Sequence, residues 1–379
     1  MQYRKFGNTG IEVSALGFGA MRLPIIGANP AHIDEKEALR IMQYAFDNGV
    51  NYVDTAYPYH EGQSEVVVGK ALKQGYREKI YLATKLPSWA IESYPDFDRY
   101  FYEQLNKLQT DHIDFYLIHN LHVNVWSKIR DIGILDWCDK IVKSGKVRFI
   151  GFSIHDTSAL FKEIIDSYKW DFCQIQYNYM NEDVQVGTEG LLYAAQKRIP
   201  VVIMEPLLGG SLVNLPPKIQ SIFDTALKNP VDMALQWLWN KQEVSLVLSG
   251  MSTMQQVKEN IEYASTSGIN SFSAEDVALM DKVKSEYSKI APIPCTKCRY
   301  CLPCPKSIEI PHLFSLYNDE MMHKEKSSWL YKIIYNNNIP ENQRADSCIK
   351  CRMCEKKCPQ GIKIADLMDE VHKELFEAD

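Results

Sequence analysis

Long apolar runs are missing from this chain of 379 residues. No stretch approaches the roughly 18–20 apolar residues that a membrane-spanning helix needs, so we expect no membrane association. The first ten residues, MQYRKFGNTG, contain basic side chains but no apolar stretch behind them. They lack the pattern of a secretory signal peptide, and we therefore expect a cytoplasmic protein.

The chain also has no excess of positively charged residues. Lys and Arg number 42 and Asp and Glu number 48, which gives a formal net charge of −6. This mildly acidic balance gives no support to a nucleic-acid partner. Hydrophobic residues make up 46% and charged residues 24% of the chain, values typical of a folded globular protein. At roughly 150 residues per domain, the length allows two domains.

The glycine-rich turn G-x-G-x-x-G, typical of open dinucleotide-binding sheets, does not follow the first apolar run. The chain instead contains eight short apolar runs, at 14–20, 50–56, 80–86, 113–119, 147–153, 171–177, 200–206 and 244–250. Amphipathic stretches lie between them, for example 35–49, 129–145 and 157–170. This alternation predicts an α/β fold, a (β/α)8 TIM barrel over residues 1–290, with an open doubly wound sheet as the alternative.

Cysteine is concentrated near the C-terminal end of the sequence. Eight of the ten cysteines form two short runs. The second run has the spacing C-x2-C-x2-C-x3-C-P, which is the bacterial ferredoxin pattern for [4Fe–4S] clusters, and the first run is one residue shorter. Zinc is the alternative, because paired C-x2-C units also bind it. Two runs of four cysteines, each ending in Cys-Pro, favour iron and sulfide.

The assignment of the sulfur ligands follows from known two-cluster ferredoxins, in which the fourth cysteine of each run binds the other cluster. We predict that the first cluster is held by Cys295, Cys298, Cys301 and Cys358. The second cluster is then held by Cys348, Cys351, Cys354 and Cys304. The two remaining cysteines, Cys138 and Cys173, lie in apolar segments and are interpreted as buried core thiols.

A linker separates the two parts of the chain. Residues 290–295, IAPIPC, contain two prolines and lead directly into the first cysteine run. Between the two runs, stretches such as HLFSLYNDEMMHK and SSWLYKIIYNNN have a helical pattern. We predict that residues 291–379 form a small, mainly helical, ferredoxin-like domain with two clusters.

Polar residues that end the strands of a barrel meet at its active-site face. Asp54 and Tyr59 follow the second predicted strand, Lys85 ends the third and His119 ends the fourth. A tyrosine titrates near ~10, and a neighbouring Lys ammonium lowers that pKa. We expect Asp54 to hold Lys85 in place beside Tyr59. Tyr59 would then act as the general acid in carbonyl reduction, while His119 binds the carbonyl oxygen.

These motifs resemble those of the aldo/keto reductase family, and the chain is similar to the branch with a C-terminal ferredoxin-type domain. The resemblance covers essentially the whole chain. The opening YRKFGNTGIEVSALGFGAMRLP resembles the family's N-terminal hairpin and first strand, and NYVDTAYPYHEGQSEVVVGKAL, ATKL and DFYLIHN match its catalytic motifs. The resemblance implies an oxidoreductase whose catalytic tetrad is Asp54, Tyr59, Lys85 and His119.

The resemblance also implies residues that hold a NAD(P)H cofactor. Ser153 and Gln174 match residues that bind the nicotinamide carboxamide, and Glu205 stands where many members stack a tyrosine on the ring. The loop after the seventh strand resembles the segment that covers the diphosphate, with amides at Gly209, Gly210 and Ser211. Glu259 and Asn260 match family residues that contact the adenine.

The choice between cofactors depends on two positions. The 2′-phosphate of NADP is usually met by a Lys and an Arg, because a dianion favours charged donors. Those positions are Gly250 and Gln256 here. A preference for NADP is therefore not supported, and NADH or the different redox cofactor FMN are the candidates.

Three functions are open at this point. The first is carbonyl–alcohol interconversion on a small molecule, coupled through two [4Fe–4S] clusters to a redox-partner protein. Nicotinamide transfers two electrons and each cluster one, so a flavin would have to connect them. The second is an ordinary NAD(P)H-dependent carbonyl reductase with structural clusters. The third, an electron-transfer module with a non-catalytic barrel, is disfavoured by the intact tetrad. Candidate walls of a pocket for a hydrophobic carbonyl are Met21, Trp89 and Trp126.

Overall fold

The computed structural model describes residues 1–27, 29–183, 185–290, 293–295, 299–323, 331–332, 334–358 and 360–376. The chain forms two compact units. The barrel unit comprises Met1–Leu212 and Pro230–Phe272, and the C-terminal unit comprises Val213–Asn229 and Ser273–Asp379. This division in space does not test the predicted domain boundary at residues 290 and 291, which stays a prediction.

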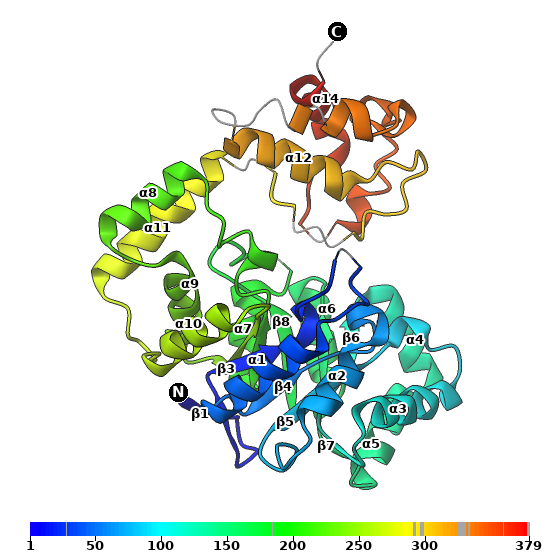
Figure 1. The fold of residues 1–379 in the computed structure, drawn as a ribbon. Coiled ribbons are helices and arrows are strands. Elements are labelled where there is room, and N and C mark those ends of the chain that lie inside the picture. Colours follow the sequence, from blue (N-terminus) through cyan, green and yellow to red (C-terminus); the bar gives the residue numbers. More distant parts are fainter. Residues whose placement is uncertain are drawn as a thin grey trace. The chain divides into compact units, whose positions relative to one another are not determined.

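The barrel unit confirms the predicted (β/α)8 fold. Eight parallel strands close into a barrel in the order β10-β3-β4-β5-β6-β7-β8-β9, and Figure 1 shows helices on its outside. Each of the eight apolar runs coincides with one strand of this barrel, and two of the strands extend one or two residues beyond their runs. The strands are β3 (Leu16–Gly19), β4 (Tyr52–Asp54), β5 (Tyr81–Leu86), β6 (Ile113–Leu121), β7 (Val147–Ile154), β8 (Phe172–Gln176), β9 (Val201–Met204) and β10 (Val244–Gly250).

The helices of the barrel unit begin and end at residues suited to those places. For example, α3 (Tyr94–Leu108) starts with a capping box between Ser93 and Asp96 and ends at Gln109, whose φ is 54°. The other helices of the described barrel unit are α1 (Glu35–Asp47), α2 (Ser64–Ala71), α4 (Val123–Ile132), α5 (Ile134–Lys143), α6 (Ser158–Ser167), α7 (Gly187–Gln196), α9 (Pro230–Trp239) and α10 (Met254–Ser265).

One amphipathic stretch differs from its expected form. Residues 129–145 are not a single helix, because α4 ends and α5 begins at Gly133. Gly133 has a φ of 103°, in the left-handed region that glycine adopts without a steric penalty. The apolar spacing continues across this residue, so the periodicity alone did not reveal the break.

The interior of the barrel is apolar at its N-terminal end. A hairpin of β1 (Tyr3–Lys5) and β2 (Glu12–Ser14) precedes the first barrel strand. Phe6, between these two strands, lies with its ring centroid 5.0 Å from that of Phe115 and 5.8 Å from that of Phe172. The same buried core includes Tyr52, Ala83, Leu117, Val202, Leu246 and Leu248. This core closes one end of the barrel, so the functional groups lie at the other.

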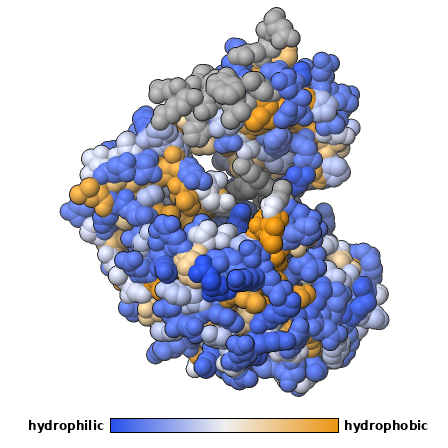
Figure 2. All heavy atoms as spheres, in the orientation of Figure 1, coloured by the Kyte–Doolittle hydropathy of each residue, from blue (hydrophilic) through white to orange (hydrophobic). Residues whose placement is uncertain are grey.

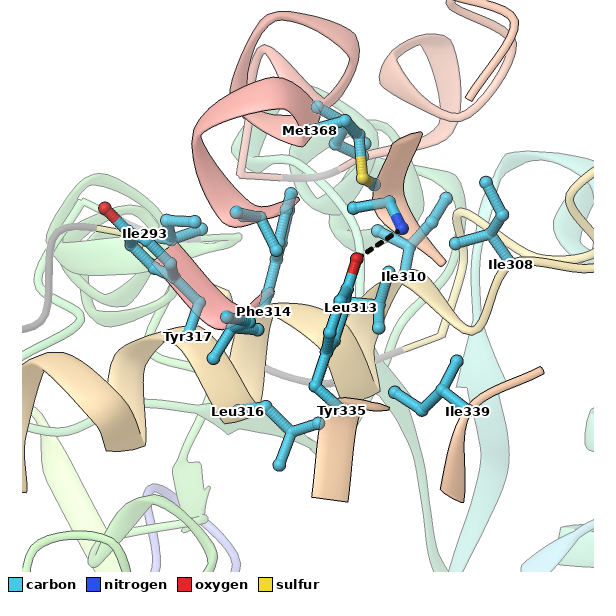
Figure 3. Close-up of a cluster of buried hydrophobic side chains, with 14 of the residues drawn as sticks. Ile293, Ile308, Ile310, Leu313, Phe314, Leu316, Tyr317, Tyr335, Ile339 and Met368 are labelled. Atoms are coloured by element: carbon cyan, nitrogen blue, oxygen red, sulfur yellow. Dashed lines mark hydrogen bonds between the residues drawn. The ribbon is translucent and has the colours of Figure 1, made fainter. Parts of the chain in front are cut away.

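The C-terminal unit is mainly helical, as predicted. Its long helices are α8 (Pro217–Ala226), α11 (Ala274–Ile290), α12 (Ile310–His323) and α14 (Ile364–Leu375). The predicted helix in SSWLYKIIYNNN lies partly outside the described residues, and Ile334–Asn338 form a π-helical turn. Figure 3 shows the core of this unit around Tyr335, whose hydroxyl accepts a hydrogen bond from the Ala345 amide (2.9 Å).

No helix in the described part of the chain combines the length and apolar character needed to cross a membrane. The face of the molecule in Figure 2 is largely hydrophilic.

Candidate active site

Four polar side chains converge at the carboxyl ends of the barrel strands, here called the mouth of the barrel. Successive residues of a strand point to opposite faces, so residues two apart share a face. Tyr52, Ala83, Leu117 and Phe172 point into the barrel core. The residues two positions further along these strands are Asp54, Lys85, His119 and Gln174. The register of the strands therefore brings these four side chains to the same level of the barrel.

Lys85 lies at the centre of this group. Its Nζ donates to Asp54 Oδ1 (2.5 Å), to the carbonyl oxygen of Thr55 (2.8 Å) and to the Tyr59 hydroxyl (3.3 Å). The side chains of Lys85 and Asp54 are only 1% and 3% exposed. An ammonium group has three N–H donors, so all the donors of Lys85 are used. The predicted contacts of Asp54 with Lys85 and of Lys85 with Tyr59 are both present.

Tyr59 is held in place by a strained turn. It begins the short helix η2 (Tyr59–Gly62), in which His60 and Glu61 have φ values of 52° and 53°. A positive φ is costly for residues other than glycine, and such strain is common at functional sites. The His60 ring anchors the turn to the first loop of the barrel, because its Nε2 accepts from the Leu23 amide (3.0 Å).

His119 lies across from Tyr59. The centroids of the two rings are 6.1 Å apart, and the ring of Trp89 lies 5.2 Å from that of His119. The backbone at His119 is fixed, because Ser88 Oγ donates to its carbonyl oxygen (2.5 Å). The next residue, Asn120, has a φ of 53°, and its amide donates to Ser153 Oγ (2.9 Å). Ser153 therefore supports the turn that carries His119, in addition to its predicted role.

Burial sets the protonation of these groups. It raises the pKa of Tyr59, which the neighbouring Lys85 opposes. The Lys85 charge lowers this pKa as we expected, but burial outweighs the charge, and the phenol stays protonated at neutral pH. Burial also lowers the pKa of His119 well below 6.5, and Lys85 lowers it further, so the imidazole is neutral. Burial would lower the pKa of Lys85, but Asp54 and Tyr59 more than offset this and keep the amine charged.

Several buried polar atoms at the mouth have no hydrogen-bond partner among the described residues. They are His119 Nδ1, Gln174 Oε1 and both side-chain polar atoms of Gln176. Buried polar groups are normally paired, so these atoms indicate where a polar ligand fits. We did not predict Gln176 from the sequence, although the period of two from Phe172 through Gln174 places it on the inner face.

The predicted nucleotide-binding residues lie around the ends of β9 and β10. In the loop after β9, Gly209 and Gly210 have φ values of 65° and 101°. The amides of Gly210 and Ser211 donate within this loop, to the carbonyl oxygens of Leu207 (2.9 Å) and Leu208 (3.2 Å). They are therefore less available to a phosphate than we expected.

The predicted adenosine contacts lie in α10. Gln256 caps this helix by accepting from the Ser252 amide (2.8 Å). Asn260 is buried and donates to Ser249 Oγ (3.0 Å), and Glu259 accepts from Gln255 (2.8 Å). All three thus have partners inside the protein.

Glu205 directly follows β9. Burial raises the pKa of Glu205, which also has a positive φ of 54°.

Other candidate residues differ in their exposure. Met21 and Trp89 are 58% and 42% exposed, which suits walls of an open pocket. Trp126 is buried in α4 and its Nε1 donates to Glu163 (3.2 Å), so it packs the barrel and forms no pocket wall. Cys138 and Cys173 are fully buried, as predicted, and burial raises the pKa of both thiols.

The C-terminal unit gathers sulfur atoms around one cavity of about 340 Å³. Cys304, from the first run, lines it together with the three leading cysteines of the second run, Cys348, Cys351 and Cys354. Lys350 and Arg352, between those three, have φ values of 52° and 57°, which turn the chain around the cavity. The four ligands predicted for the second cluster thus line one cavity, which Cys301 from the first run also lines, and their assignment to one cluster stays a prediction.

The ligands of the first predicted cluster are less completely described. Cys301 lines the same cavity, and Cys295 and Cys358 pack against the hydrophobic core of the unit. Cys298 lies outside the described residues. No group of three or more His, Cys, Asp or Glu within the described ranges is close enough to hold a single metal ion.

Comparison with known proteins agrees with this geometry. The sequence profile of the aldo/keto reductase family matches residues 15–285. The chain belongs to the aldo/keto reductase family. The profile of a 4Fe-4S dicluster domain matches residues 294–363. This protein is therefore an aldo/keto reductase-type oxidoreductase with a C-terminal iron–sulfur domain.

Individual relatives cover mainly the barrel. The chain is 30% identical to L-galactose dehydrogenase from Arabidopsis thaliana over 286 residues, 69% of this chain and 87% of the relative. It is 28% identical to probable aldo-keto reductase 1 from Glycine max, over 68% and 82% of the two chains. Among solved structures, the holo form of aldo-keto reductase AKR11C1 from Bacillus halodurans has a TM-score of 0.63 and 26% identity, over 75% of this chain and 96% of that one.

The buried pair of Lys85 and Asp54 leads to a prediction about stability. Lys85→Met leaves the Asp54 carboxylate buried without its counter-charge, so we expect a loss of about 3–5 kcal/mol in the free energy of unfolding. The double variant Asp54→Asn/Lys85→Met removes both charges and should be distinctly more stable than Lys85→Met. Urea denaturation followed by circular dichroism measures both. Equal stability of the two variants would contradict an ionised pair.

The iron content of variants can test whether the fourth cysteine of each run binds the other cluster. If the chain holds the two predicted clusters, Cys348→Ala/Cys351→Ala should remove the second and leave about four irons per chain, from about eight. Adding Cys304→Ala to this background should cost no further iron, whereas adding Cys358→Ala should remove the remaining cluster. The two triple variants each add one Cys→Ala substitution to the same background, so a difference in iron content between them cannot come from a general loss of folding. The reverse result would show that each run holds its own cluster.

Proposed function

We propose that the barrel interconverts a small-molecule carbonyl and its alcohol with a nicotinamide cofactor. The observation that supports this most directly is the chain of contacts from Asp54 through Lys85 to Tyr59, with distances of 2.5 and 3.3 Å. A protonated phenol beside a buried ammonium suits a general acid, because the ammonium stabilises the phenolate that remains after the proton leaves.

The proposed steps assign one task to each residue. Reduced nicotinamide, when bound, supplies a hydride to the carbonyl carbon. Tyr59 donates its proton to the carbonyl oxygen, and Lys85 stabilises the resulting phenolate until a proton from solvent replaces it. His119, as a neutral imidazole, donates a hydrogen bond to the carbonyl oxygen and holds it near Tyr59. In the oxidation direction the same groups act in reverse.

The cofactor contacts are part of this proposal. Ser153 and Gln174 would hold the nicotinamide carboxamide, and the Gln174 oxygen that lacks a partner suits its amide. The loop at Gly209, Gly210 and Ser211 would cover the diphosphate, and the adenosine would lie against Gln256, Glu259 and Asn260. We favour NADH over NADPH, because Gly250 and Gln256 offer no charge to a 2′-phosphate.

The iron–sulfur domain, which we assign to residues 291–379, would connect the barrel to one-electron carriers. We propose two [4Fe–4S] clusters, one on Cys295, Cys298, Cys301 and Cys358 and one on Cys348, Cys351, Cys354 and Cys304. These clusters supply one-electron transfer when bound. Hydride chemistry moves two electrons, so coupling needs a converter, for which FMN is the candidate, and a redox-partner protein in the cytoplasm.

Tyr59→Phe tests the barrel chemistry. We expect kcat for carbonyl reduction with NADH to fall by about 10²–10⁴-fold, because the general acid is lost while the packing of the ring is kept. The substrate panel should contain hydrophobic aldehydes for reduction with NADH and L-galactose for oxidation with NAD⁺, since one relative is an L-galactose dehydrogenase. Tyr57→Phe is the matched control, because its hydroxyl contacts the surface residue Glu103. Full activity of Tyr59→Phe would exclude the proposed acid.

The pH profile of the wild-type protein checks the same assignment. Tyr59 must be protonated for reduction, and its pKa is raised above 10, so kcat/KM should stay level through neutral pH and fall only in strong alkali. His119 has a pKa well below 6.5, so no step should occur at about pH 6.5. A clear inflection there would contradict a neutral His119.

Anaerobic electron paramagnetic resonance tests the coupling. The protein is purified without oxygen and mixed with NADH, with or without added FMN. If the barrel and the clusters form one electron path, signals of reduced clusters should appear, and Tyr59→Phe should leave them in place without substrate. Clusters that dithionite reduces but NADH does not, even with FMN, would support structural clusters in an ordinary reductase.

A further inference from the structure

Arg22 is held firmly at the mouth of the barrel, in the short helix η1 (Ala20–Arg22) that follows β3. Ser252 Oγ donates to its carbonyl oxygen (2.7 Å). Ser64 Oγ donates to the carbonyl oxygen of Ala20 (2.9 Å), and the amide of Leu23 donates to His60 (3.0 Å). Three side chains, two from the segment after β4 and one from the loop after β10, thus fix the backbone on both sides of Arg22.

The side chain of Arg22 extends from this anchor across the ends of β10 and β9. A Cβ atom added to Gly250 would lie 3.2–3.3 Å from the Cβ, Cγ and Cδ atoms of Arg22, so the stem lies over Gly250. A Cβ atom added to Gly209 would lie 3.2 Å from Arg22 Nη2. The guanidinium group therefore ends beside the loop after β9. No carboxylate in the described ranges comes within ion-pair distance of it, although its charge lowers the pKa of Glu205 against the effect of burial.

This position is where barrels of this class bind phosphate. Their phosphate site lies at the loops after the seventh and eighth strands, which are β9 and β10 here. The loop after β9 has few free donors, because the amides of Gly210 and Ser211 are used within it. A diphosphate favours charged donors, and a guanidinium binds it through paired N–H groups.

We propose that Arg22 binds the diphosphate of the dinucleotide at the ends of β9 and β10. This inference rests on the proposed nicotinamide function and adds to it a residue from the first loop. Gly250, which lacks the side chain that would carry a cation, leaves the space through which the Arg22 stem passes.

Binding measurements test this proposal without relying on catalysis. Arg22→Met keeps most of the stem over Gly250 but removes the charge, and should weaken binding of NADH and of ADP by roughly 10- to 100-fold. Arg22→Lys should recover part of the loss. Arg148→Met is the control, because Arg148 is an exposed arginine at the opposite end of β7. Fluorescence titration for NADH and calorimetry for ADP give the dissociation constants.

A second variant changes Gly250, the other residue of the contact with the Arg22 stem. Gly250→Leu should push the Arg22 stem aside and weaken ADP binding, and adding it to Arg22→Met should cost little more, because both changes remove one interaction. Unchanged binding of NADH and ADP by Arg22→Met would overturn the proposal and leave the proposed function intact. Binding of ADP but not of NADH by the wild type, still dependent on Arg22, would overturn the nicotinamide function and keep the phosphate site. Binding of neither by the wild type would overturn both.

Discussion

The buried ion pair between Lys85 and Asp54 is the interaction on which the rest of the site depends. Removing an ammonium group from water is costly, and a single carboxylate at 2.5 Å with a backbone oxygen at 2.8 Å offsets that cost. The pair holds the lysine charged beside Tyr59, and this charge adds to the effect of burial that keeps His119 neutral. One contact therefore places a fixed positive charge beside Tyr59, the proposed acid in η2, and near His119, the proposed hydrogen-bond donor on β6.

The barrel makes this arrangement possible by separating its interior into two levels. The lower level is apolar and closed by Phe6 from the N-terminal hairpin. The upper level carries Asp54, Lys85, His119, Gln174 and Gln176, each on the inner face of its strand. Because the parallel strands are held in register by their hydrogen bonds, these side chains cannot move apart independently. The strain at His60, Asn120 and Glu205 lies at the same edge, where the chain turns away from the strands.

The C-terminal unit places its candidate ligands differently from the barrel, which holds its polar groups in the interior. Its apolar core around Phe314 and Tyr335 is small, and the cysteines lie at the edge of that core rather than within a barrel. Cys304 and Cys348 are distant in sequence but line one cavity. A cluster bound to cysteines of both runs would link two segments that are distant in sequence. Such a cluster would stabilise the fold as well as carry electrons.

The sequence alone determined the architecture and indicated which residues form the candidate site. Eight apolar runs predicted the barrel, the spacing of cysteines predicted the iron–sulfur domain, and Asp54, Tyr59, Lys85 and His119 were identified by their places at strand ends. Local patterns carry these signals because side-chain alternation and ligand spacing are local properties. The break at Gly133, the protonated state of Tyr59 and the reach of Arg22 to Gly209 depended on the tertiary structure. Burial, and contacts between residues distant in the chain, exist only after the strands have closed into a barrel.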